Sequence, residues 1–326
     1  MRAIEISAFG PPEVLKLVDR PIPQPASGQV LVRVAAAGVA RADLLQRQGK
    51  YPPPEGASDL PGLDIAGTVE SVGADVTAFS KGDPVCAILT GGGYAEYCAV
   101  PVQQVLPVPD AWTLHEAATL PENLFTVYDN VVTRAGLQKN QTILIHGGSS
   151  GIGTMAIMLA GSFDATIIVT AGSDAKCQAC LALGAQHAIN YKTSDFVTEV
   201  HQKTDGRGAD VILDMVGGSY LDKNISSLAI DGSLVIIATQ GGHIAPLNIA
   251  SLMKKRARVM SSHMRARTPS AKGKVAIELL KNVWPSLPAK KNIRPVIDCT
   301  FPLAEAYRAH AHMESNQNIG KILLVI

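Results

Sequence analysis

The chain has 326 residues, of which 47% are hydrophobic and 17% charged, and its net charge is +1. This length is too great for one small core and predicts two domains. The near-neutral charge excludes a strongly basic binder of nucleic acid or membrane surfaces and favours an enzyme or small-molecule binder. The start "MRAIEISAFGPPEVLK" lacks a signal-peptide core and no run approaches about 18 apolar residues, so we expect a cytoplasmic protein without a membrane span.

Residues 1 to about 122 alternate short valine-rich runs with Gly and Pro, as in "GQVLVRVAAAGV" and "LDIAGTVESVG". This pattern predicts a β-rich unit with tight turns. The segment "ARADLLQRQGKYPPP" predicts one short helix, which the prolines end.

From about residue 140, apolar strand-like runs alternate with helical stretches. The predicted strands are "TILIH", "ATIIVTA", "HAINY", "ADVILDMV", "SLVIIAT" and "ARVMSS". The predicted helices cover residues 151–162, 174–183, 194–203 and 219–229. Such alternation predicts a parallel sheet covered on both faces, the doubly wound α/β architecture, and six strands suffice for a complete dinucleotide fold.

After about residue 265 the strict alternation stops. A helix ("AKGKVAIELLKNVW"), an extended piece ("IRPVIDCTF"), a second helix ("LAEAYRAHAHME") and a last strand ("GKILLVI") follow. We therefore assign this tail to the first domain. The expected domains are residues 1–122 with 266–326, and residues 123–265.

Glycines cluster in "HGGSSGIG", where the first strand of the α/β region meets a helix. Glycine permits a sharp turn and close approach of a ligand to the backbone, and amides at a helix start attract phosphate. Gly148, Gly151 and Gly153 thus predict a pyrophosphate site, although Ser150 stands where G-x-G-x-x-G has its second glycine. A purely structural left-handed turn is the alternative.

The end of the second strand predicts the cofactor type. A NAD-binding fold usually places an acid here for the ribose hydroxyls, but residues 168–173 contain none. Gly172 and Ser173, followed by Lys176, suit a 2′-phosphate instead, which favours NADP. Tyr191, after the third strand, is a candidate to cover the same phosphate or the adenine. The alternative for Tyr191 is a tyrosine at the edge of the core, and the alternative for Lys176 is a solvated helix lysine.

Cysteine and histidine spacing gives no sign of a disulfide framework or a metal site. The five cysteines are scattered, and Cys177 and Cys180 lie within an expected helix without a second pair at zinc spacing. His310 and His312 are two residues apart on an expected helix, so they do not share a face.

The combined motifs resemble the zinc-independent quinone oxidoreductases of the medium-chain dehydrogenase/reductase superfamily, most of all the p53-inducible quinone oxidoreductase branch. The resemblance covers the whole chain. The segments that carry it are "RADLLQRQGKYPPP", "LPGLDIAGTVESVG", "GDPVCAILTGGGYAEY", "IHGGSSGIGT", "TAGSDAKCQACLALGA", "INYK", "ILDMVGGSYLDKN" and "NIGKILLVI".

This resemblance implies a GroES-like catalytic domain, a Rossmann domain and an active site in the cleft between them. It implies NADPH as the cofactor, a quinone as the hydride acceptor, and a homodimer or homotetramer joined through the Rossmann sheets. A reductase of activated C=C bonds in enones or alkenals is an alternative enzyme, and a weakly catalytic NADPH-binding redox sensor is an alternative from another class. Without a basic stripe, no nucleic-acid partner is expected.

The resemblance also implies catalytic residues. Tyr51 is the candidate to contact the quinone oxygen, and a loop tyrosine packed between domains is the alternative. Asp43 in "RAD" either orients the site or caps its helix. Related enzymes often carry Asn before this triplet, where this chain has Ala40.

For the cofactor, Thr126 matches the residue beside the nicotinamide, with a core-helix threonine as the alternative. The segment "SSHMRAR" is expected near the nicotinamide, and Arg265 is either a surface residue or steers phosphate. His146 is expected to be structural rather than an acid–base catalyst. The complete set of expected cofactor-binding residues is Thr126, Gly148, Ser150, Gly151, Ile152, Gly153, Gly172, Ser173, Lys176, Tyr191, Gly241, Gly242, Met264 and Arg265.

Zinc ligands are expected to be absent. Zinc-dependent members of the superfamily place Cys, a His–Glu pair and Cys at positions that here hold Ala40, Leu63 with Asp64, and the neighbourhood of Asn123. The structural zinc lobe with its four cysteines is also missing, so the resemblance implies chemistry without a metal.

Overall fold

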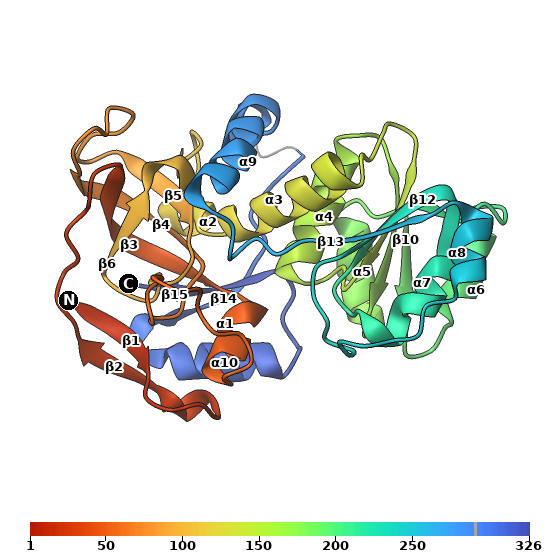
Figure 1. Ribbon diagram of the computed structural model, residues 1–326, viewed down its shortest axis with the longest axis horizontal. Coiled ribbons are helices and arrows are strands. Elements are labelled where there is room, and N and C mark those ends of the chain that lie inside the picture. The colour runs from red at the N-terminus through yellow and green to blue at the C-terminus, as the bar shows by residue number, and fades with distance from the viewer. Residues whose placement is uncertain (290–291) are drawn as a thin grey trace. The chain divides into compact units, whose positions relative to one another are not determined.

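The computed structural model describes residues 1–289 and 292–326. The chain divides into two compact units, each with its own hydrophobic core (Figure 1). Unit 1 comprises Met1–Phe125, Met264–Lys291 and Pro295–Ile326, and unit 2 comprises Thr126–His263 and Asn292–Arg294. We keep residues 1–122 with 266–326, and residues 123–265, as the proposed domain bounds.

Unit 1 is built on a seven-stranded sheet in the order β14-β15-β3-β4-β5-β7, with β6 also paired to β3, and on the separate pair β1-β2. The strands are β1 (Arg2–Ile6), β2 (Leu15–Asp19), β3 (Gln29–Val39), β4 (Asp64–Val72), β5 (Pro84–Ile88), β6 (Tyr97–Pro101), β7 (Val105–Pro107), β14 (Ile297–Pro302) and β15 (Lys321–Val325).

The C-terminal strands complete the sheet of unit 1. Strand β15 pairs antiparallel with β3, and β14 pairs parallel with β15. Valines of β3, including Val30, Val32 and Val34, meet Ile322 and Leu324 of β15 in one core. The alternating apolar pattern of β3 and the apolar run of β15 therefore account for this pairing.

The helices of unit 1 are short, apart from the one that follows residue 268. They are α1 (Arg41–Arg47), α2 (Leu114–Ala117), α3 (Pro121–Val127, whose last two residues belong to unit 2), α9 (Pro269–Asn282) and α10 (Ala306–Glu314). The helices α2 and α3 lie in a region for which the sequence predicted no element. Helix α1 confirms the one that "ARADLLQRQ" predicted.

Unit 2 contains a six-stranded parallel sheet in the order β10-β9-β8-β11-β12-β13. Its strands are β8 (Thr142–His146), β9 (Thr166–Ala171), β10 (His187–Asn190), β11 (Ala209–Asp214), β12 (Leu228–Ile236) and β13 (Arg258–Ser261). All six lie within or overlap the predicted runs. Every residue of β8 is buried, as expected for a central parallel strand.

Helices cover both faces of this sheet. Helices α4 and α5 pack on β8, β9 and β10, whereas α6, α7 and α8 contact one another in sequence (Figure 1). Their bounds are α4 (Gly151–Gly161), α5 (Asp174–Ala182), α6 (Phe196–Lys203), α7 (Leu221–Ser227) and α8 (Ile249–Lys255). Together the two units confirm the predicted class, a β-rich domain plus a doubly wound parallel-sheet domain. No helix among residues 1–289 and 292–326 has the length and apolar character needed to cross a bilayer.

Candidate functional site

The glycine turn joins β8 to α4 so tightly that Gly147, Gly148 and Gly153 have no room for a side chain. Gly147 has a φ of +67°, which favours glycine. A Cβ on Gly153 would lie 2.2 Å from the Gly147 carbonyl oxygen, and a Cβ on Gly148 would lie 2.7 Å from the Val169 Cβ. The absence of a Cβ at Gly153 thus allows the first turn of α4 to contact the glycine turn, and its absence at Gly148 allows the glycine turn to contact β9.

Ser150 is the N-cap of α4. Its hydroxyl oxygen accepts a hydrogen bond from the Gly153 amide at 3.0 Å, and the hydroxyl donates to the Gly147 carbonyl at 2.8 Å. The single hydroxyl hydrogen is therefore used within the turn, so a direct hydrogen bond from Ser150 to a phosphate is not formed in this arrangement. The Gly151 and Ile152 amides lie in the first turn of α4, where helix amides attract anions, so they stay the predicted phosphate contacts.

A second group of predicted residues meets at the end of β9. A Cβ on Gly172 would lie 2.7 Å from the Tyr191 hydroxyl oxygen, so the tyrosine ring comes down on this glycine. Ser173 caps α5 by accepting from the Lys176 amide at 3.3 Å. Tyr191 is 45% exposed, which fits a residue that covers a ligand better than one at the edge of the core.

One acid near this group was missed from the sequence. Asp174 follows directly after the acid-free window, and its carboxylate accepts a hydrogen bond from the Asn190 side chain at 2.7 Å. This contact joins the start of α5 to the end of β10. Asp174 therefore places a carboxylate next to the residues predicted to bind a 2′-phosphate.

The Gly241–Gly242 loop lies after β12, at the same carboxyl edge of the sheet. It docks on the loop after β11, because the Gly241 amide donates to the Val216 carbonyl at 2.6 Å and the Gly218 amide donates to the Gly242 carbonyl at 2.9 Å. A Cβ on Gly241 would lie 2.2 Å from the Ser219 hydroxyl oxygen. Ligands of open α/β sheets bind at this edge.

Thr126 begins unit 2 and is half-buried on α3. Its carbonyl accepts a hydrogen bond at 2.7 Å from the Asn130 side chain. Helix α3 continues directly into a seven-residue π-helix (η3, Tyr128–Arg134), a form that is frequent at functional sites. No pattern in the sequence predicts this π-helix.

Tyr51, Asp43, Met264 and Arg265 belong to unit 1. The sequence had placed Met264 and Arg265 at the end of the other domain. Arg265 is 4% exposed, so the alternative that it is a surface residue is wrong. Its guanidinium lies 5.1 Å from the centre of the Tyr51 ring and donates to the Gln46 side chain at 2.6 Å. The arginine thus fixes the tyrosine ring in place.

Burial sets the protonation state of Tyr51. It raises the pKa of the phenol to about 12, against the opposing positive charge of Arg265. The phenol therefore keeps its proton at neutral pH and can donate a hydrogen bond.

Asp43 is fully buried at the start of α1. Its carboxylate accepts from the Ala40 amide at 2.9 Å, the Gly62 amide at 3.0 Å and the Tyr94 hydroxyl at 3.2 Å. Burial raises its pKa, although the two amides oppose this shift. The contact with the Ala40 amide is the helix cap that the sequence offered as one alternative, and the contact with Gly62 holds the loop before β4; a role in orienting the site stays a prediction.

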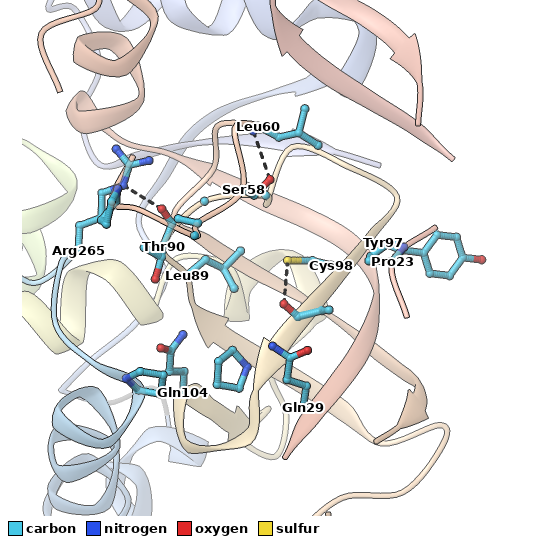
Figure 2. A pocket seen from close by; sticks show the side chains of 18 of the residues that line it. Pro23, Gln29, Ser58, Leu60, Leu89, Thr90, Tyr97, Cys98, Gln104 and Arg265 are labelled. Atoms are coloured by element: carbon cyan, nitrogen blue, oxygen red, sulfur yellow. Dashed lines mark hydrogen bonds between the residues drawn. The ribbon is translucent and has the colours of Figure 1, made fainter. Parts of the chain in front are cut away.

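Figure 2 shows a pocket of about 520 Å³ in unit 1. Ser58, Thr90, Gln104 and Arg265 contribute polar atoms to its lining, and the Arg265 Nε donates to the Thr90 carbonyl at 2.8 Å. Among the predicted site residues, Arg265 borders this pocket and Tyr51 does not. Arg265 therefore contacts two features, the pocket and the tyrosine ring.

A buried ion cluster includes Asp64, one of the positions that the sequence compared with zinc ligands. The Lys321 ammonium lies 3.0 Å from the Asp64 carboxylate and 2.8 Å from that of Glu122. Lys321 is 3% exposed and Asp64 is fully buried. Burial lowers the pKa of Lys321, but the two carboxylates outweigh it and raise the pKa above its usual value, so the lysine is charged.

Two histidines considered from the sequence are buried and structural. The His146 ring lies 2.9 Å from the Thr170 hydroxyl oxygen and 2.7 Å from the Asn224 side-chain oxygen, and burial lowers its pKa to about 4. His310 contacts Arg47 and Tyr94, and burial together with the Arg47 charge lowers its pKa to about 3. Neither ring is placed as a general acid or base at neutral pH.

The predicted residues thus form separate groups. The glycine turn, the Gly172–Tyr191 group and the Gly241–Gly242 loop share the carboxyl edge of the unit 2 sheet. Tyr51 and Arg265 form a contact within unit 1.

Comparison with known proteins agrees with both units. The family model described as "Alcohol dehydrogenase GroES-like domain" matches residues 26–110, and that described as "Zinc-binding dehydrogenase" matches residues 151–282. A solved mycobacterial protein, Rv1454c in complex with NADPH, is 28% identical, covers 100% of both chains and has a TM-score of 0.87. The solved CurK enoyl reductase is 26% identical, covers 99% of this chain and 98% of its own, and has a TM-score of 0.87.

The quinone oxidoreductase of Rattus norvegicus is 30% identical over 329 residues, which cover 100% of this chain and 98% of that protein. With both family models matched and this identity extending over both units, the chain belongs to the quinone oxidoreductase family of the medium-chain dehydrogenase/reductase superfamily.

Proposed function

We propose that this protein is an NADPH:quinone oxidoreductase that works without zinc. Family membership supports the general part of this proposal, that the protein is an oxidoreductase that uses a nicotinamide cofactor. The observation that supports NADPH is the group at the end of β9, where the Tyr191 hydroxyl approaches Gly172, Lys176 lies in the first turn of α5, and residues 168–173 contain no acid. A 2′-phosphate needs positive charge and the absence of a facing carboxylate.

The cofactor supplies hydride, and the protein supplies position and polarity. The backbone amides of the glycine turn hold the pyrophosphate, and Gly241 and Gly242 keep the neighbouring edge free of side chains. Tyr51 donates a hydrogen bond to the acceptor oxygen as the hydride arrives. Asp43 acts as a positioning residue through the backbone at Ala40 and Gly62.

Zinc independence is supported by the donor atoms at the matched positions. Ala40 and buried Leu63 offer no ligand, and the Asp64 carboxylate already faces the Lys321 ammonium at 3.0 Å. A cation would have to displace this ammonium and would find no thiolate or imidazole at these positions. These residues do not fit a catalytic zinc ion.

A homodimer through the unit 2 sheets is supported by an open edge. Strand β13 ends the sheet and pairs only with β12 among the described strands. Its Val259 is 38% exposed, and the nearby residues Ile249 and Met253 on α8 are 62% and 72% exposed. Such an apolar edge suits pairing with a second copy.

Membership of the p53-inducible branch stays a prediction.

The cofactor proposal is tested by the dissociation constants of NADPH and NADH. We expect NADPH to bind more tightly, and Lys176→Ala to weaken NADPH by about 10-fold, the loss of one charged hydrogen bond, with little effect on NADH. Lys203→Ala, an exposed lysine on α6, is the matched control. Asp174→Ser should strengthen NADPH further if this acid opposes the 2′-phosphate. Equal binding of both cofactors by the unaltered protein would overturn the NADPH assignment.

A C=C reductase is the second candidate, favoured by the likeness to the CurK enoyl reductase. Turnover of 1,2-naphthoquinone and of a panel of α,β-unsaturated aldehydes with NADPH separates the two. If only the aldehydes are consumed, the quinone proposal fails. Tight NADPH binding with negligible oxidation by any acceptor would favour a redox sensor.

A further inference from the structure

A bulge in β14 turns two neighbouring side chains toward the same place. In the pairing with β15, Ile297 faces Lys321 and Cys299 faces Ile322, so Asp298 is an extra residue in β14. Adjacent residues of a regular strand point to opposite faces, and a bulge breaks this alternation and redirects a side chain. Asp298 and Cys299 therefore both reach the same neighbour, helix α10, which packs against β14.

His312 completes a cluster of three different donor atoms. Its Nε2 lies 2.7 Å from an Asp298 carboxylate oxygen. One donor atom from each of Asp298, Cys299 and His312 lies within 4.8 Å of the other two. The second Asp298 oxygen accepts a hydrogen bond from the Ile319 amide at 2.8 Å, which fixes the carboxylate plane. Ligating carboxylates in metal sites are held by such outer contacts.

The cysteine of this cluster differs from the other four. Cys86, Cys98, Cys177 and Cys180 are buried, whereas Cys299 is partly exposed. The sulfur of Cys299 can therefore meet an ion from solvent. Sulfur, imidazole nitrogen and carboxylate oxygen form a donor set that suits Zn²⁺, which takes tetrahedral sites of these ligands at about 2.0 to 2.3 Å.

We propose that Asp298, Cys299 and His312 form a binding site for a thiophilic divalent cation, with Zn²⁺ as the ion that fits these donors best. Water fills the fourth position. Binding releases the thiol proton to solvent and replaces the direct His312–Asp298 contact with two bonds to the ion. The site shares no residue with the positions that hold catalytic zinc in the superfamily, and it is independent of the proposed reaction.

Co²⁺ tests the site because a cobalt–thiolate bond gives a charge-transfer absorption band. The full-length protein is titrated with Co²⁺, and Zn²⁺ is then added. We expect one Co²⁺ per chain, a thiolate band in the near ultraviolet, and loss of that band as Zn²⁺ displaces cobalt. Cys299→Ser should abolish the band, and His312→Gln should weaken Zn²⁺ binding by at least about 10- to 100-fold.

His243→Gln is the matched control, since this exposed histidine lies in unit 2 and outside the cluster. It should leave the stoichiometry, the band and the affinity unchanged. Circular dichroism and turnover with NADPH check that each variant is folded. Absence of saturable one-to-one binding by the unaltered protein would overturn the proposal, as would a thiolate band that survives Cys299→Ser or an unchanged affinity in His312→Gln.

Discussion

The predicted site residues of the two units are held in place by different kinds of interaction. In unit 2 the turn at Gly148–Gly153 is shaped by backbone contacts too close for a Cβ, and its hydrogen bonds run between amides, carbonyls and one hydroxyl. Unit 1 instead contains buried charges: Lys321 lies between Asp64 and Glu122, and Arg265 lies beside Tyr51. A site of the first kind fails when atoms are added, and one of the second kind fails when a charge is removed.

Lys321→Met should give the largest effect, because it leaves two carboxylates without their buried partner. We expect the free energy of unfolding to fall by about 3 to 5 kcal/mol at pH 7. Denaturant unfolding measures this loss, with Lys281→Met on the exposed side of α9 as the control. Adding Asp64→Asn to the Lys321 variant should restore part of the stability. A loss below about 1 kcal/mol would show that the cluster is not held by charge.

Gly153→Ala tests the opposite principle. Its Cβ would lie 2.2 Å from the Gly147 carbonyl oxygen, so the turn must open. We expect the Kd for NADPH to rise on the order of 100-fold, equivalent to about 2.7 kcal/mol. Gly161→Ala in the same helix is the matched control, because its Cβ meets nothing within 4 Å. Similar Kd values for the two variants, measured by fluorescence titration, would contradict the backbone account.

His310→Gln should change how stability depends on pH. Arg47 can only donate, so the His310 Nδ1 accepts, and the neutral ring donates through Nε2 to the Tyr94 hydroxyl, which donates to Asp43. The folded pKa of about 3 lies below the unfolded value of about 6.5. The stabilisation is complete above pH 6.5 and is lost as the pH falls from 6.5 toward 3.

At pH 5 the loss from this one group is about 2 kcal/mol. We therefore expect the decrease in unfolding free energy between pH 7 and pH 5 to be smaller by about this amount in His310→Gln. Exposed His115→Gln should keep the full decrease. Parallel curves for the unaltered protein and His310→Gln would show that the ring is not neutral when folded.

Tyr51→Phe should give the smallest effect, because it keeps the ring under Arg265 and removes one hydroxyl. We expect kcat/KM for a quinone to fall about 10-fold, or roughly 1.4 kcal/mol, with the Kd for NADPH unchanged. Because the pKa of this phenol is about 12, the ratio of the two rates should stay constant between about pH 6 and 9. Tyr307→Phe on α10 is the control. An unchanged kcat/KM would exclude the tyrosine from the reaction.

Unit 2 was predictable from sequence because its determinants are local. Apolar runs mark β8 and β9, and the glycines between β8 and α4 are neighbours in the chain. Unit 1 was less predictable because its contacts join distant residues: Arg265 reaches Gln46, and Lys321 reaches Asp64. Charge and burial at these positions depend on the folded chain. From the sequence, His312 was compared only with His310, because no local pattern links His312 to the bulge at Asp298.

The pairing of β15 with β3 has a consequence for how the protein forms during synthesis. Strand β3 leaves the ribosome early, and its partner follows only after all of unit 2 has been made. Until then one edge of the unit 1 sheet is uncovered and open to pairing with other chains. The sheet of unit 2 does not depend on a strand made much later, because its strands are joined by short crossovers. Unit 2 should therefore be finished first and unit 1 last.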